Sequence, residues 1–100
     1  MAIIYSGTKK FSDEDKNNLF ELVNSNYWKL IKRFSNLEFT VHVDKKSVTG
    51  KRHRYIVKVK AEAPNVIGDV EREGWDLRQL LHRIFLDLKV ELDHRFGKKK

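Results

Sequence analysis

The stretch from Leu37 to Ala63 decides the fold and reads LEFTVHVDKKSVTGKRHRYIVKVKAEA. Its two arms alternate between apolar and polar residues, and lysine and arginine crowd its middle. A period of two puts successive side chains on opposite faces of a strand, so each arm has one apolar face. These apolar positions are Leu37, Phe39, Val41, Val43, Tyr55, Val57, Val59, Ala61 and Ala63. The stretch is therefore predicted to be a basic β-hairpin.

The hairpin and the residues just before it carry an unusual charge. The window from Lys29 to Lys60 holds ten basic residues against Glu38 and Asp44, a net +8 that exceeds the +7 of the whole chain. Each Lys or Arg that meets a phosphate releases condensed counterions. A basic region of this density therefore suggests a polyanionic partner.

A short strand and a helix are predicted before the hairpin. Residues 2–6 are mostly apolar and lead to Gly7, as a strand would. Ser12 is a good helix N-cap, because the acidic residues 13–15 that follow it complement the helix dipole. Spacings of three and four extend the helix to about Phe34, through Phe20, Val23, Tyr27, Leu30, Ile31 and Phe34.

A fourth strand and a second helix are predicted after the hairpin. Pro64 and Asn65 indicate a turn, and residues 66–71 alternate again. After Gly74, and after Trp75, which we assign to packing, a helix is indicated by the apolar stripe Leu77, Leu81, Ile84, Phe85, Leu88 and Leu92. Gly97 is a candidate for its C-cap.

This order of elements, β-α-β-β-β-α, predicts an α+β fold in which two helices pack on one face of a four-stranded mixed sheet. A right-handed crossover makes the first two strands parallel, and the later pairs are antiparallel. Residues 1–97 are expected to form a single domain, followed by a basic tail at 98–100. The open sheet face is expected to carry Arg52, Arg54, Lys58 and Lys60.

Composition excludes several classes of protein. A chain of 100 residues has room for one core, and without cysteine it forms neither a disulfide nor a thiolate metal site. No apolar segment approaches the ~20 residues of a membrane span, and the N-terminus lacks the apolar run of a signal peptide. We therefore expect a cytoplasmic protein with no membrane partner.

No active site is predicted. The four histidines, at 42, 53, 82 and 94, lie too far apart in sequence to suggest a metal site. No carboxylate has an apolar context that would raise its pKa, and no glycine-rich phosphate loop or nucleophile motif is present. We expect neither an enzyme nor a metal, cofactor or small-molecule substrate.

Candidate RNA-binding residues fall into two groups. The first lies around the hairpin turn, where like charges repel in the free protein, and comprises Lys45, Lys46, Lys51, Arg52 and Arg54. The second is expected to line a groove between the helices, together with His82, and comprises Lys29, Lys32, Arg33, Arg78 and Lys89. Trp28 is a candidate for stacking on a base. An ordinary solvated surface is the competing interpretation of these charges.

Several strings together resemble one known family. Ile3 to Gly7 is similar to its opening strand and glycine, Lys29-Leu30-Ile31-Lys32 to its Lys-Leu-x-Lys string, and Asp76-Leu77 to its Asp-Met helix start. The apolar spacing from Leu81 to Leu92 agrees as well. Over nearly its whole length the chain resembles a short form of the ribosome hibernation-promoting factor family, also called ribosome-associated inhibitor proteins.

The resemblance implies a fold like that of double-stranded-RNA-binding domains. It also implies a non-enzymatic protein, expected to be monomeric, that binds small-subunit rRNA in the ribosomal channel for mRNA and tRNA and inhibits translation. Lys29 and Lys32 inherit a role in RNA contact. Where the family tends to have basic residues in the last helix, this chain has Asp87, Val90 and His94, so more of the RNA contact is expected at the hairpin.

Two other functions stay open at this point. One is a domain that binds structured RNA without preference for the ribosome. The other is a protein-interaction module whose hairpin meets an acidic partner, with Asp76, Asp87 and Glu91 as a second surface.

Overall fold

The computed structural model describes residues 3–47, 52–64 and 66–97. Its elements follow the predicted order, with one short 3₁₀ helix, η1, added after the first strand. They are β1 (Ile3–Ser6), η1 (Thr8–Lys10), α1 (Asp13–Leu30), β2 (Glu38–Ser47), β3 (His53–Ala63), β4 (Val66–Gly74) and α2 (Leu77–Gly97). The predicted α+β class and element order are confirmed. Lys51 and the tail 98–100 lie outside the described residues.

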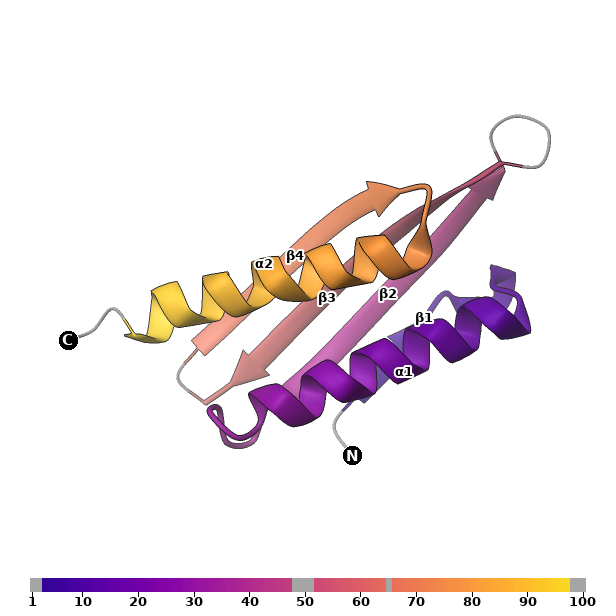
Figure 1. Cartoon of the computed structure of the whole chain (residues 1–100). Coiled ribbons are helices and arrows are strands. Elements are labelled where there is room, and N and C mark those ends of the chain that lie inside the picture. The colour runs from indigo at the N-terminus through magenta and orange to yellow at the C-terminus, as the bar shows by residue number, and fades with distance from the viewer. Residues whose placement is uncertain (1–2, 48–51, 65, 98–100) are drawn as a thin grey trace.

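The strands form one mixed sheet in the order β1-β2-β3-β4. β1 runs parallel to β2, and the other neighbouring strands are antiparallel, as predicted. In the hairpin register, Phe39 lies opposite Ala61 and Val41 lies opposite Val59. Both helices cover the same side of the sheet (Figure 1). The other side of the sheet is left without a covering element among the described residues.

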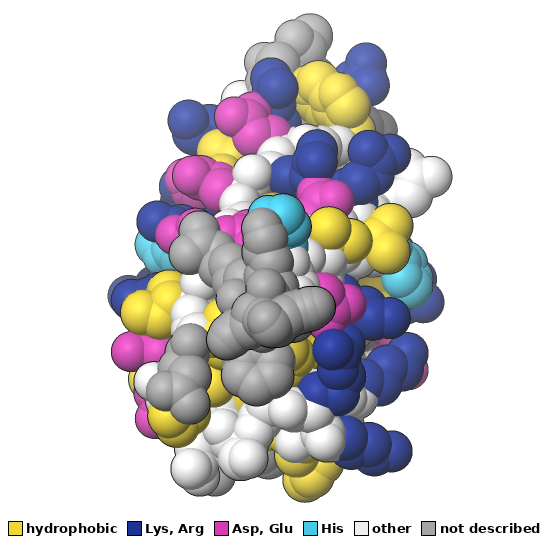
Figure 2. Space-filling view, turned by 90° about the vertical axis from the view of Figure 1, so that its left-hand side faces the viewer, with side chains coloured by type: hydrophobic (Ala, Val, Ile, Leu, Met, Phe, Trp, Pro, Cys, Tyr) yellow, Lys and Arg dark blue, Asp and Glu magenta, His cyan; other side chains and the backbone are white. Residues whose placement is uncertain are grey.

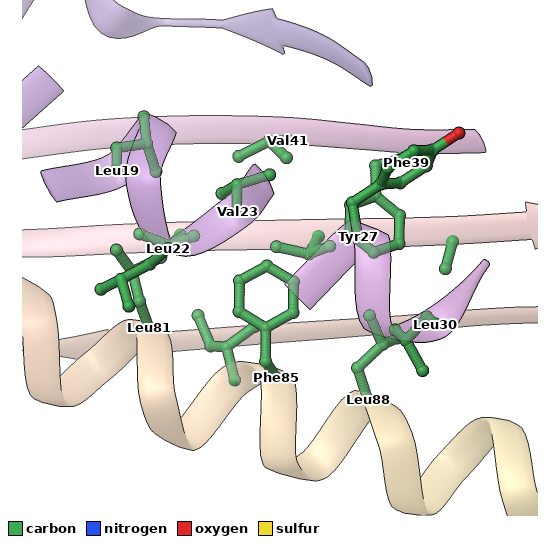
Figure 3. Packing of buried hydrophobic residues seen from close by; sticks show 14 of the residues in the cluster. Leu19, Leu22, Val23, Tyr27, Leu30, Phe39, Val41, Leu81, Phe85 and Leu88 are labelled. Atoms are coloured by element: carbon green, nitrogen blue, oxygen red, sulfur yellow. The ribbon is translucent and has the colours of Figure 1, made fainter. Parts of the chain in front are cut away.

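The core lies between the helix layer and the apolar face of the hairpin. Phe39, Val41, Val57 and Val59 are completely buried. The ring of Phe39 meets Tyr27 of α1 edge-on, with centroids 5.2 Å apart, and stacks on Phe85 of α2 at 5.8 Å (Figure 3). Phe39 therefore joins the sheet to both helices.

The first helix begins where predicted and ends earlier. The Ser12 hydroxyl accepts a hydrogen bond from the Asp15 backbone N–H at 3.1 Å. α1 ends at Leu30 rather than near Phe34, and the chain then turns through Asn36, whose φ of 58° is left-handed. Phe34 is buried all the same, because the turn packs its side chain into the core cluster.

Phe20 was predicted in the buried stripe of α1, and this is wrong. Its side chain is 36% exposed and meets Tyr5 of β1 edge-on at 4.8 Å, while Leu19 and Leu22 are buried. Because β1 is the edge strand, the sheet ends beneath this flank of the helix and leaves Phe20 partly uncovered.

The boundaries of β4 and α2 can be compared with the predicted ones. β4 reaches Gly74, beyond the predicted residue 71, because it stays paired with β3 as far as Tyr55. Gly97 is the last residue of α2, which agrees with a helix end at this position.

Gly7 marks a close approach between the chain after β1 and the neighbouring strand β2. Its φ of 83° lies in the left-handed region, and a Cβ added there would lie 2.1 Å from the Val43 carbonyl oxygen. Both the backbone conformation and the available space therefore require glycine.

We expect Gly7→Ala to lower the free energy of unfolding by about 2 kcal/mol or more, because backbone strain and a steric clash act together. Urea unfolding followed by circular dichroism measures this loss. Gly74→Ala is the matched control, since its added methyl group has its nearest neighbours in the Leu80 side chain, with Cδ1 at an ordinary 3.5 Å. Equal losses in the two variants would contradict the assignment.

Candidate nucleic-acid interface

A groove between α1 and α2 brings together three of the predicted cations. Lys29 and Arg33 come from the C-terminal end of α1 and the turn after it, and Lys89 comes from α2. The groove encloses a hollow of about 360 Å³. Its other lining residues are Asn26, Leu30, His82, Phe85 and Leu86. His82 was predicted to lie in this groove, and it does line the hollow.

The acidic residues near this groove do not cancel its positive charge. Asp93 is occupied by an ion pair with the Arg33 guanidinium, which also lies 5.3 Å from the centroid of the Phe34 ring. Asp87 points toward β4 and pairs with Arg72. Asp87 therefore does not neutralise the groove. Within the described residues, Lys29 and Lys89 have no ion-pair partner.

The remaining candidates on the helices and in the turn after α1 lie outside the groove lining. Arg78 donates a hydrogen bond from Nη1 to Asn18 Oδ1 at 3.0 Å, which ties the start of α2 to α1. Lys32 is exposed, and Trp28 is 54% exposed with its ring edge-on to Tyr27 at 6.0 Å. Trp28 is therefore accessible to a ligand, as stacking on a base would require.

Lys45 belongs to a partly buried cluster at the base of the hairpin. Its side chain is 15% exposed, and its Nζ lies 3.0 Å from Asp15 Oδ2 and 5.4 Å from the centroid of the Tyr55 ring. The Tyr55 hydroxyl donates to the same Asp15 oxygen at 3.1 Å. The cluster joins β2 and β3 to the first turn of α1, so Lys45 has a structural partner that the sequence did not indicate.

Some of the basic residues nearer the hairpin turn already have partners within the protein. Arg54 forms an ion pair with Glu73 at 2.8 Å. Arg52 lies over the ring of Trp75, with its Cζ 4.4 Å from the centroid, and Lys46 is exposed. Lys51 lies outside the described residues. Of the described hairpin cations in the predicted set, Lys46 and Arg52 have no acidic partner.

The open face of the sheet carries cations, as predicted, but acids balance them. Lys58 lies opposite Glu71 and Lys60 opposite Asp69 in the β3–β4 register. Figure 2 shows the same contrast, because Lys and Arg side chains gather along its right-hand side, where the helices lie, whereas both charge signs alternate at the left. For Lys58 and Lys60 an ordinary solvated surface is the better interpretation.

The two basic groups lie at opposite ends of the molecule. In Figure 1 the end of β2 and the start of β3 lie at one end, and the C-terminal end of α1 lies at the other. The principal extents are 51 × 24 × 16 Å. The candidate cations therefore form two surfaces, which we call the helix groove (Lys29, Arg33, Lys89) and the hairpin end (Lys46, Arg52).

Residues 3–47, 52–64 and 66–97 contain no group of three or more His, Asp or Glu side chains placed to hold a metal ion. In the same part of the chain, neither helix is long and apolar enough to cross a membrane.

The fold and the site define a small α+β domain with unpaired cations in the groove between its helices and at the end of its hairpin. Among solved structures it is similar to a ribosomal subunit interface protein from Coxiella burnetii, at 19% identity over 98% of this chain and 100% of that chain, with a TM-score of 0.65. It is also similar to the N-terminal domain of Protein Y from Thermus thermophilus, at 22% identity over 93% of both chains, with a TM-score of 0.53. Neither a family model nor a curated protein sequence matches the chain. The similarities show that the fold is the one these two proteins share.

Protein stability is expected to fall between pH 10 and 12. Burial, followed by the negative charge and hydrogen bond of Asp15, raises the pKa of Tyr55 from 10.0 to about 12. In this range the unfolded chain loses the phenolic proton while the folded protein keeps it, so the free energy of unfolding decreases as pH rises. Burial raises the pKa of Tyr5 to about 12 as well, with the same sign.

Urea midpoints measured across this range test the effect. Tyr55→Phe is expected to show a smaller fall than the native protein, and Tyr5→Phe/Tyr55→Phe a smaller one still, because fewer groups titrate differently in the two states. Parallel curves for all three proteins would contradict this account.

Proposed function

We propose that this protein binds the rRNA of the small ribosomal subunit in the channel used by mRNA and tRNA and inhibits translation, as a hibernation factor does. The observation that carries the proposal is the helix groove, in which Lys29, Arg33 and Lys89 face one hollow. The fold supports the ribosome as partner, since one similar structure is a ribosomal subunit interface protein. We propose a cytoplasmic, monomeric protein that acts by occupying its site and not as an enzyme.

The groove suits a phosphate backbone for a simple electrostatic reason. Lys29 and Lys89 have no ion-pair partner among the described residues, so a phosphate bound there breaks no internal pair. Arg33 is already held by Asp93 and by the Phe34 ring, which fixes the direction of its guanidinium fork. An oriented guanidinium loses less side-chain entropy on binding phosphate.

We propose the hairpin end as a second contact with RNA. Lys46 and Arg52 are exposed there, and Lys51 stays part of the proposal from the sequence. Lys45, Arg54 and Arg78 already bind Asp15, Glu73 and Asn18, so we expect smaller contributions from them. Contacts at both ends of a 51 Å body would hold it along a channel and exclude mRNA and tRNA by steric overlap.

A domain that binds structured RNA in general is the second candidate. Phosphate contacts carry little sequence information, and both proposed surfaces consist mainly of such cations. The acidic-partner alternative is weaker, because Asp76 accepts the Arg78 backbone N–H at 3.1 Å at the start of α2 and Asp87 pairs with Arg72. Both carboxylates therefore already have partners within the protein and are less suited to bind another one.

We expect Lys29→Ala/Lys89→Ala to weaken co-sedimentation with small ribosomal subunits and to lower the slope of log affinity against log salt by about one for each lysine. The control is Lys58→Ala/Lys60→Ala, which removes the same charge from the balanced sheet face. Its affinity and salt slope should stay close to native, and it should still inhibit translation in a cell-free system. Equal loss in both variants, or binding that does not depend on salt, would contradict the groove assignment.

Competition separates the two candidate functions. If the ribosome is the partner, purified small subunits should displace the bound protein from a plain RNA duplex at much lower concentration than the duplex displaces it from subunits. Equal competition per phosphate would favour the general RNA binder, because shape and charge alone would then account for affinity.

A further inference from the structure

Trp75, assigned to packing from the sequence, lies outside the buried core. It lies between the end of β4 and the start of α2, and its side chain is 46% exposed. The guanidinium carbons of Arg52 and Arg54 lie 4.4 Å and 5.6 Å from its ring centroid. Two arginines of the hairpin therefore contact the indole ring, while much of its surface stays open to solvent.

The same indole borders an open hollow of about 500 Å³ on the β4 side of α2. Three polar side chains of α2, those of Gln79, His82 and Arg83, also line it, and they have no hydrogen-bond or ion-pair partner among the described residues. The hollow is large enough for one nucleotide. It combines an aromatic wall with an amide, an imidazole and a guanidinium.

The acidic side chains that border this hollow already form ion pairs or hydrogen bonds within the protein. Glu73 is paired with Arg54 at 2.8 Å, and Asp76 accepts the backbone N–H groups of Arg78 and Gln79 at 3.1 Å and 3.3 Å. Arg72 and Asp87 pair with each other nearby. Arg83 is therefore left as the cation without an acidic partner among the described residues of the hollow.

We propose that this hollow binds one unpaired nucleobase of an RNA strand, with the base stacked on Trp75 and its phosphate on Arg83. Gln79 presents an amide, which has both donors and an acceptor for a base edge. His82 and Leu86 border both this hollow and the helix groove, so one strand crossing α2 reaches both. The inference rests on RNA binding in the proposed function and adds the class of ligand, a single-stranded or flipped-out nucleotide.

Trp75 fluorescence reports directly on this site. In Trp28→Phe, Trp75 is the only tryptophan, and a short single-stranded adenosine oligonucleotide should quench its emission by stacking. A fully paired RNA duplex at the same phosphate concentration should quench it much less. Equal quenching by a poly-glutamate peptide would overturn the proposal, because it would show anion binding without a base.

Affinity for the labelled oligonucleotide, measured by fluorescence anisotropy, locates the contact. Trp75→Ala is expected to bind roughly tenfold or more weakly, as for loss of one stacked base, while Trp75→Phe keeps part of the affinity. Arg83→Gln should weaken binding more than Lys9→Gln, which removes the same charge from an exposed residue of η1. Trp75→Ala with native affinity, or equal effects of the two charge variants, would overturn the proposal.

Ribosome co-sedimentation of the same variants keeps the two proposals distinguishable. Quenching of Trp75 by the oligonucleotide without ribosome binding would support the nucleotide site and contradict the proposed function. Ribosome binding without any quenching of Trp75 would do the reverse. Circular dichroism of Trp75→Ala should match the native protein, since Trp75 is not part of the buried core.

Discussion

Burial of alternate side chains along β2 and β3 is the constraint on which the rest of the structure depends. The register that sets Phe39 opposite Ala61 and Val41 opposite Val59 brings all four side chains to the same face. A slip of one residue would turn this set toward solvent, so the helices can dock on only one register. Phe39 meets rings from both α1 and α2, which makes the hairpin the floor that positions the two helices and hence the groove between them.

The same alternation decides where charge is left unbalanced. It sends Lys58 and Lys60 to the open face, where β4 supplies Glu71 and Asp69 directly opposite. On the helix layer, Asp87 forms an ion pair with Arg72 of β4. It therefore does not compensate the charges of Lys29 and Lys89, which line the groove. Net charge therefore says little about the location of a binding surface, because pairing across strands removes part of it.

Some of the basic residues around the hairpin have structural partners. Lys45 meets Asp15 and Tyr55 in a partly buried cluster that fixes the base of the hairpin against α1. Arg52 lies on Trp75, where β4 leads into α2. Cation and aromatic side chains thus connect the hairpin with the starts of both helices, and these contacts hold Trp75 at the rim of its hollow.

The sequence by itself determined the element order, the mixed sheet, the cap at Ser12 and the buried face of the hairpin. These features depend on local chemistry and on periods of two and about 3.6, which the chain displays directly. It placed Phe20 in the core wrongly, because the extent of the sheet beneath a helix is not a local property. Likewise only the tertiary structure decided that Lys45 pairs with a residue thirty positions earlier. It also placed Lys29 and the hairpin end at opposite ends of the molecule and left Trp75 exposed, since each of these depends on which distant residues the fold brings together.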